Sequence, residues 1–256
     1  MFFVAVFAKN CYYIKAKLFF SEVNMLITDQ ALDFLFINKI NNSREFYQQH
    51  KEEYRRLVVE PLARLVDILA PTVQSIDAQI ECIPKIGKCI SRIHRDTRFS
   101  YDKSLYRDTA WVSFMRQKKL YNGLPGFFFE ISPRLVRWGM GYYCASKEAM
   151  ESFRELVASQ HKLFVRTVKM ANDNPQLLLE GESYKRSKRP DLSPIQQLYI
   201  NKKSVCFIRN EDISILERED LHELIINDFL ALAPAYELFM LAEMRKEHQQ
   251  PNLNEV

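Results

Sequence analysis

Apolar residues recur with a helical period at both ends of the chain and with a strand-like pattern in the middle. Up to about residue 84 they lie three or four positions apart, and this spacing returns after residue 146. Between these regions, short runs rich in β-branched and aromatic residues are separated by proline and glycine. Consecutive strands flanked by helices favour an α+β fold over an alternating βαβ fold. We therefore predict an antiparallel or mixed sheet of about four to six strands, packed against helices from both the N- and C-terminal parts.

The first helices are predicted from this spacing and from residues that begin helices. A helix is expected over residues 29–40, with Thr28 or Asp29 as its cap. Asn42 is followed three residues later by Glu45, which is the pattern of a capping box for a second helix.

Prolines and a serine divide the remaining helical regions. Pro61 cannot donate a helical hydrogen bond, so the pattern restarts there and is expected to continue to Pro71. A later helix is capped by Ser146, and the last two helices meet at Pro234.

Four segments between and after these helices are predicted to be strands. A fifth segment is predicted to be either a short strand or a helical turn. A Pro-Arg pair before residue 135 predicts a tight hairpin. The predicted strands are 88–95, 126–132, 135–143 and 201–209, and the open case is 111–115.

The length of the chain allows one large domain or two small ones, and the sequence contains no linker long enough to separate two domains. We predict a single α+β domain over residues 25–248. Residues 1–24, which precede a second methionine at Met25, are expected to be an extension outside the core, and residues 249–256 a polar tail.

The chain has no run of 18 apolar residues, so no membrane association is expected. Its five cysteines include no C-x-x-C pair, the spacing that zinc ribbons and thioredoxin-type sites require. Reduced thiols and a cytoplasmic location are the expectation.

Positive charge is concentrated in one segment. Residues Lys85–Arg107 contain seven basic and two acidic side chains, a net charge of +5, against +4 for the whole chain. A local positive field attracts phosphate esters, carboxylates or nucleic acid. The alternative is a solvated strand edge with structural ion pairs.

The alternation of a strand places four polar side chains of this segment on one face. If the segment is extended, Arg92, His94, Asp96 and Arg98 share that face. Guanidinium groups bind carboxylate or phosphate in a bidentate way, and an acid beside them could orient the imidazole or fix an arginine. Alternatively, Asp96 only neutralises an arginine in a structural network.

The run RIHRDTRFSYDKSLYRD at residues 92–108 resembles the hallmark of the domain of unknown function 2461 family, R-I-Y/H-R-D-x-R-F-S-x-D-K-x-P-Y-K. Asn41-Asn42 and the stretch 125–133 resemble two further motifs of that family, and the similarity spans about residues 26–244. The resemblance implies a fold type, and the family has no established activity from which a mechanism could be transferred.

The sequence departs from the family pattern at several places. Leu105 replaces the usual proline, Arg107 replaces the usual lysine, and the glycine-rich turn is reduced to residues 139–141. The late family segment is present only as Tyr184–Pro190, without its glycine.

That late segment has four basic side chains within five residues, 185–189. If it folds over residues 92–107, the two segments line one basic pocket; otherwise it is a solvated loop. Tyr101, Tyr106 and Tyr184 could stack on nucleic-acid bases, or they could be half-buried tyrosines with a satisfied hydroxyl.

Several enzyme classes are excluded because their motifs are absent from the sequence. There is no P-loop, no dinucleotide fingerprint, no G-x-S-x-G elbow and no H-E-x-x-H helix, and the five histidines are scattered. We expect neither a metal site nor a cofactor.

Three functions remain, in the following order. The first is binding of a small anionic ligand, which can be phosphorylated; the second is an enzyme that uses the same pocket for acid–base chemistry, with His94, Asp96 and Glu130 as candidates. The third is nucleic-acid binding through both basic segments, and a purely structural ion-pair network is the remaining alternative. The candidate ligand-binding residues are Arg92, Arg95, Arg98, Lys103, Tyr106, Arg107, Lys185 and Arg186.

Overall fold

The structure is a computed structural model that describes residues 27–98, 100–116 and 123–249. The predicted N-terminal extension, residues 1–24, lies outside the described residues. The same holds for the predicted tail from residue 250 onwards.

The described residues form one six-stranded antiparallel sheet, which confirms the α+β prediction. The strand order is β1-β2-β3-β4-β6-β5, and β3 and β4 form the predicted hairpin. The segment 111–115 is therefore a strand and not a helical turn. The strands are β1 (Ile80–Glu81), β2 (Ala110–Arg116), β3 (Gly126–Ile131), β4 (Val136–Gly141), β5 (Leu178–Glu180) and β6 (Cys206–Glu211).

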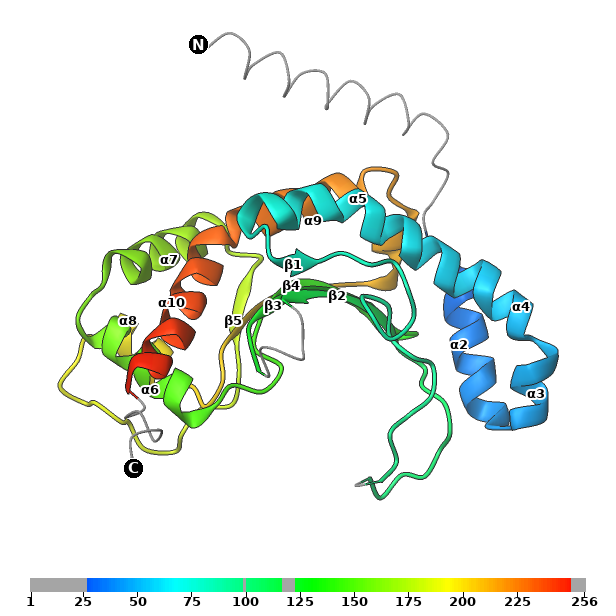
Figure 1. Cartoon of the computed structure of the whole chain (residues 1–256), viewed down its shortest axis with the longest axis horizontal. Coiled ribbons are helices and arrows are strands. Elements are labelled where there is room, and N and C mark those ends of the chain that lie inside the picture. Colours follow the sequence, from blue (N-terminus) through cyan, green and yellow to red (C-terminus); the bar gives the residue numbers. More distant parts are fainter. Residues whose placement is uncertain (1–26, 99, 117–122, 250–256) are drawn as a thin grey trace, which may run out of the picture.

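Helices from both ends of the chain pack against this sheet and give the molecule the shape of an arch (Figure 1). The N-terminal set is α2 (Asp29–Asn41), α3 (Arg44–Gln49), α4 (Lys51–Tyr54), the π-helical turn η2 (Arg55–Val59) and α5 (Glu60–Ile76). The later set is α6 (Lys147–Ala158), α7 (Lys162–Asp173), α8 (Pro194–Ile200), the 3-10 turn η3 (Ile213–Glu217), α9 (Leu221–Ala231) and α10 (Ala233–Gln249).

In Figure 1, α5 and α9 run along one side of the sheet, α2–α4 lie at one end of the arch, and α6–α8 lie at the other. Among the described residues, no single helix has the length and hydropathy of a membrane span, and α9 with α10 up to Arg245 meets that test only as a pair bent by 48°.

Alternation along the strands produces the core on the helix-covered face of the sheet. Phe127, Phe129 and Trp138 are fully buried there, and the Phe127 ring lies 5.0 Å from Phe229 of α9 and 5.3 Å from Tyr236 of α10. Burying each such ring contributes about 1.5–3 kcal/mol to the free energy of unfolding. These contacts join the C-terminal helices to the centre of the sheet.

The opposite face of the sheet is more polar. Trp111, Glu130 and Arg137 occupy neighbouring positions across β2, β3 and β4, and all three are half-buried. Arg137 donates to Glu130 over 2.6 Å. Glu130, a candidate base, is therefore held in an ion pair on the sheet.

The predicted cap of the second helix is wrong by one residue. Ser43, and not Asn42, is the N-cap of α3, and its hydroxyl accepts a hydrogen bond from the Phe46 amide. Asn42 instead ends α2 in the left-handed conformation, with φ of 48°. Its side-chain oxygen accepts a hydrogen bond from the Leu105 amide instead of capping α3.

The strand predicted over 88–95 is also wrong. This segment pairs at isolated positions and not as a ladder: Ile90 bridges to Val112 and to Ile86, and His94 bridges to Tyr106. The segment leaves β2 after residue 91 and then pairs with the chain at 105–107, so neither ladder continues long enough to form a strand.

Pro71 does not end a helix, because α5 continues to Ile76. Pro71 and Asp67, the residue four positions earlier, are both exposed. The carbonyl that loses its helical partner can therefore bond to water. Five described elements, β1, β5, α7, α8 and η3, were not predicted, and the first two are only two and three residues long.

A buried ion pair links α9 to the sheet, and it provides a test of the fold. Asp228 accepts hydrogen bonds from Trp138 Nε1 at 2.8 Å and from Arg209 at 3.3 Å. We expect Asp228→Ala to lower the free energy of unfolding by about 1–3 kcal/mol, because it leaves the buried Trp138 N–H without its acceptor, while Arg209 keeps its ion pair with Glu211. Asp220→Ala, which breaks an exposed pair with Arg218, should cost less than about 1 kcal/mol. Equal losses in urea unfolding would contradict this reading.

Candidate functional site

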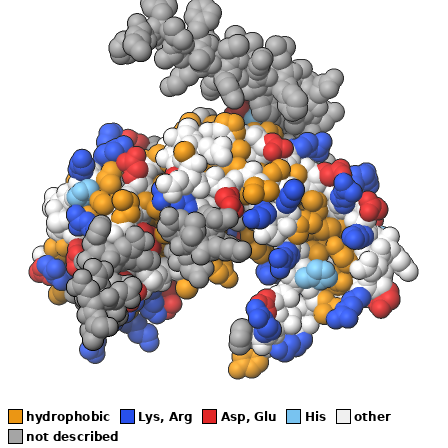
Figure 2. Space-filling model, in the orientation of Figure 1, with side chains coloured by type: hydrophobic (Ala, Val, Ile, Leu, Met, Phe, Trp, Pro, Cys, Tyr) orange, Lys and Arg blue, Asp and Glu red, His pale blue; other side chains and the backbone are white. Residues whose placement is uncertain are grey.

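Residues 92–107 fold back on themselves as a two-armed loop, which we call the basic hairpin. Its arms are joined by two backbone hydrogen bonds, from Arg95 N to Leu105 O at 2.9 Å and from Arg107 N to Ile93 O at 3.0 Å. Figure 1 shows the hairpin projecting away from the sheet, on the same end of the arch as α2 and α3. Lysine and arginine side chains are spread over this end with acidic side chains among them (Figure 2).

The predicted alternation along the first arm is present, but the exposed side chains do not converge. Arg92, His94, Asp96 and Arg98 are exposed, whereas Ile93 between them is buried. Asp96 accepts from Arg98 at 2.7 Å, and this hydrogen bond lowers the pKa of Asp96 to about 2. Asp96 therefore neutralises an arginine, which was the structural alternative to a role in ligand binding.

Arg95 is directed to the other side and is fixed inside the hairpin. Its guanidinium donates to Asp102, to the Ser104 hydroxyl at 2.6 Å and to the Ser100 hydroxyl at 3.4 Å. Hydrogen bonds from the Ser104 backbone amide, which has the larger effect, and from Arg95 lower the pKa of Asp102 to about 2. Lys103 donates to the backbone carbonyl of Thr97 at 2.8 Å. These contacts hold the tip of the hairpin together.

The base of the hairpin is attached to α2 by two polar contacts. Asn42 Oδ1 accepts from the Leu105 amide at 2.6 Å, and Lys39 donates to Asp108 at 2.7 Å. Burial raises the pKa of Asp108, but the Lys39 hydrogen bond and the nearby Arg134 outweigh it, so the net shift is downward. Asp108 is therefore an ionised partner for cations of two other segments.

An aromatic cluster supports the same junction. The buried Tyr106 ring lies 5.2 Å from Tyr47 of α3 and 5.0 Å from His94. Partial desolvation against these rings, followed by the charge of Arg44, lowers the pKa of His94, which favours its neutral form. His94 thus lies at the exposed edge of the cluster, with one side of its ring against the tyrosines.

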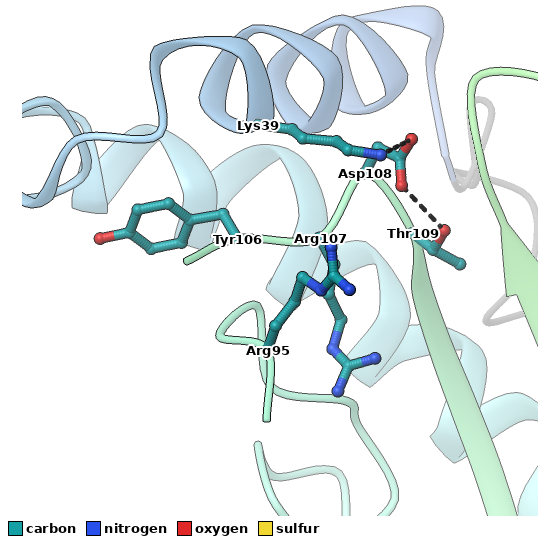
Figure 3. Close-up of a pocket in the computed structure, with 6 residues that line it drawn as sticks. All are labelled: Lys39, Arg95, Tyr106, Arg107, Asp108 and Thr109. Atoms are coloured by element: carbon teal, nitrogen blue, oxygen red, sulfur yellow. Dashed lines mark hydrogen bonds and ion pairs between the residues drawn. The ribbon is translucent and has the colours of Figure 1, made fainter. Parts of the chain in front are cut away.

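A pocket of about 200 Å³ opens between α2 and the base of the hairpin (Figure 3). Arg95 and Arg107 both line it, and Figure 3 shows the Tyr106 ring extending away from their guanidinium groups. Its lining residues are Lys39, Arg95, Tyr106, Arg107, Asp108 and Thr109.

Arg107 carries the least compensated charge in this pocket. Its Nε donates weakly to the His94 carbonyl at 3.4 Å, and its guanidinium carbon lies 4.9 Å from the centre of the Trp111 ring. It forms no salt bridge with any described residue. The pocket is therefore lined by three cationic side chains: Lys39 is paired with Asp108, Arg95 is paired with Asp102, and Arg107 has no carboxylate partner among the described residues.

Three of the eight predicted ligand residues, Arg95, Tyr106 and Arg107, line this pocket. Arg92 lies beside Gly87, outside the pocket lining, and Arg98 and Lys103 are held near the tip. Lys185 and Arg186 belong to the loop before α8, at the other end of the arch, so the two basic segments do not form one pocket (Figure 1).

Sequence reasoning missed Lys39, Asp108 and Thr109. Asp108 is the last residue of the family-like run, and Lys39 lies in the last turn of α2, close to Asn42. Within the described part of the chain, no group of three or more His, Cys, Asp and Glu side chains is arranged to hold a metal ion.

The structure is that of an α+β protein, with a small pocket between α2 and a projecting hairpin. The chain belongs to the family described as conserved hypothetical protein (DUF2461), whose model matches residues 30–238. That match includes α2 from its second residue onwards and the whole basic hairpin. No curated protein matches the chain.

The two carboxyls of the hairpin should titrate independently. The Asp102 pKa lies at about 2, below its ordinary value of 3.8, so its pairing with Arg95 is complete above pH 3.8 and is lost as pH falls toward 2. In Arg95→Ala the Asp102 pKa should rise only part of the way to 3.8, because the Ser104 amide still donates to it.

Carbon-detected NMR titration of the side-chain carboxyls measures both values. Asp96 serves as the control, since it is held by Arg98 and should titrate unchanged in the Arg95 variant. A normal Asp102 pKa in the unmodified chain, or equal shifts of both carboxyls, would show that this pairing is misassigned.

Proposed function

We propose that the pocket at the base of the basic hairpin binds a small oxyanion, such as a phosphate ester or a carboxylate. The guanidinium of Arg107 carries this proposal, because it lines the same pocket as Arg95 and Lys39 and forms no salt bridge with a described residue. Planar guanidinium forks match the geometry of such anions. Arg95 and Lys39, which are paired with Asp102 and Asp108, add polar N–H groups to the same lining.

The size of the pocket supports a small ligand or the charged end of a larger one. A volume of about 200 Å³ falls below the range of about 300–1,000 Å³ that is typical of drug-sized ligands. The charged group of the ligand would face the arginines, and any remainder would extend to solvent.

The arrangement supports binding more strongly than acid–base catalysis. Of the three candidate acids and bases, Asp96 is paired with Arg98 and Glu130 with Arg137. His94 packs against two tyrosine rings. None of the three lines the pocket.

A thermal-shift titration with inorganic phosphate tests the proposal. At about 100 times its Kd, a ligand adds roughly 2.7 kcal/mol, or about 5–10 °C in Tm for a chain of this size. We expect Arg107→Ala to abolish this shift. Arg92→Ala removes an exposed arginine of the other arm, outside the pocket lining, and it should keep the shift. No shift with phosphate or simple phosphate esters, or equal losses in both variants, would refute the proposal.

Trp111 is a positioning residue for Arg107, because its ring holds the guanidinium by a cation–π contact of 4.9 Å. We expect Trp111→Leu to weaken phosphate binding about two- to fivefold, which corresponds to about 0.5–1 kcal/mol. Trp111→Phe retains an aromatic face and should recover most of this affinity, as measured by calorimetry. If the two variants bind phosphate equally, the aromatic contact has no part in holding Arg107.

A further inference from the structure

The second basic segment forms a surface of its own, which we call the Tyr184 patch: residues 181–191 and 201–203 together with Arg154. Without Arg154, these residues contain six lysine and arginine side chains and two acids. Their net charge of +4 equals that of the entire chain. The patch lies at the opposite end of the arch from the pocket (Figure 1).

Three cationic groups surround a single ring in this patch. Lys188 Nζ lies 4.5 Å, the Arg154 guanidinium carbon 5.4 Å and Lys203 Nζ 5.9 Å from the centre of the Tyr184 ring. The ring attracts each cation, but cations this close to one point also repel one another. Glu182 compensates Lys203 over 2.6 Å. The other two form no salt bridge with a described residue.

Backbone hydrogen bonds hold this arrangement in place. The Tyr184 amide donates to the Asn201 carbonyl at 2.8 Å, and the Lys188 amide donates to Asn201 Oδ1 at 3.0 Å. Arg154 donates to the carbonyls of Ile200 and Lys202, both at 3.0 Å. The loop is thus preorganised, so little further ordering is needed when a partner binds.

Two further cations extend the patch into solvent. Lys185 and Arg186 are exposed, and neither forms a salt bridge with a described residue. Arg189, by contrast, is paired with Asp191 at 2.8 Å. Uncompensated charges thus follow the loop as a row, next to an aromatic ring.

We infer that the Tyr184 patch binds the phosphate backbone of a single-stranded nucleic acid. A row of cations matches a polymer with one negative charge per nucleotide, and an aromatic ring among them provides a surface on which a base can stack. Acidic peptides and lipid headgroups would use the charges but not the ring. The inference is independent of the phosphate pocket, because none of its residues lines that pocket.

Fluorescence anisotropy with a labelled single-stranded oligonucleotide tests this inference in the full chain. The triple variant Lys185→Ala, Arg186→Ala, Lys188→Ala should bind at least about tenfold more weakly, and its log–log salt slope should be less steep by about 2 for three lost phosphate contacts. The matched control removes three exposed cations from the other end of the arch, Lys51→Ala, Arg56→Ala and Arg64→Ala, and should bind like the unmodified chain.

The contribution of the ring is measured separately. Tyr184→Ala should weaken oligonucleotide binding about five- to a hundredfold, which corresponds to about 1–3 kcal/mol per stacked base, whereas Tyr184→Phe should retain it. Heparin binding should not depend on the ring. The inference is overturned if the unmodified chain does not bind the oligonucleotide. It is overturned too if the patch variant and the control variant weaken binding by the same factor. It is also overturned if Tyr184→Ala binds like the unmodified chain, or if only anionic vesicles are bound.

Discussion

The site depends on how the basic hairpin distributes two carboxylates among four arginines. Asp96 pairs with Arg98, and Asp102 pairs with Arg95. Asp108, at the end of the hairpin, is engaged by Lys39 of α2. Neither Arg92 nor Arg107 forms a salt bridge within the described chain. Of these two, only Arg107 lies in the pocket, so the uncompensated charge is located at the base of the hairpin.

The attachment of the hairpin to α2 converts that charge into a site. A guanidinium on a free loop would be solvated and would attract anions only weakly. Here the amide of Leu105 is held by Asn42, and the neighbouring Tyr106 ring is buried against Tyr47. The part of the hairpin that lines the pocket therefore has a fixed backbone. Arg107 contacts both the His94 carbonyl and the Trp111 ring. Preorganisation of this kind lowers the entropic cost of binding a small anion.

Local patterns in the sequence predicted the fold class and which side chains of residues 92–98 share a face, but not the pocket. Period-two alternation placed Arg92, His94, Asp96 and Arg98 on one face, and all four are exposed, because alternation depends only on an extended backbone. The pocket depends on contacts between distant residues. Lys39 and Asp108 are 69 positions apart, and Asn42 and Leu105 are 63 apart. No local periodicity encodes such pairs, and a shared face did not show that Asp96 would be taken by an arginine only two residues away. For the same reason, the charge of the late segment was visible in the sequence, whereas its separation from the hairpin was not.

NMR of the arginine Nε–Hε groups during titration with inorganic phosphate tests the central claim most directly, because it observes each guanidinium separately. The signals of Arg95 and Arg107 should shift together and reach saturation, while that of Arg92 stays in place. Shifts of Arg92 as large as those of Arg107, or unchanged signals for Arg95 and Arg107, would contradict an oxyanion site at the base of the hairpin.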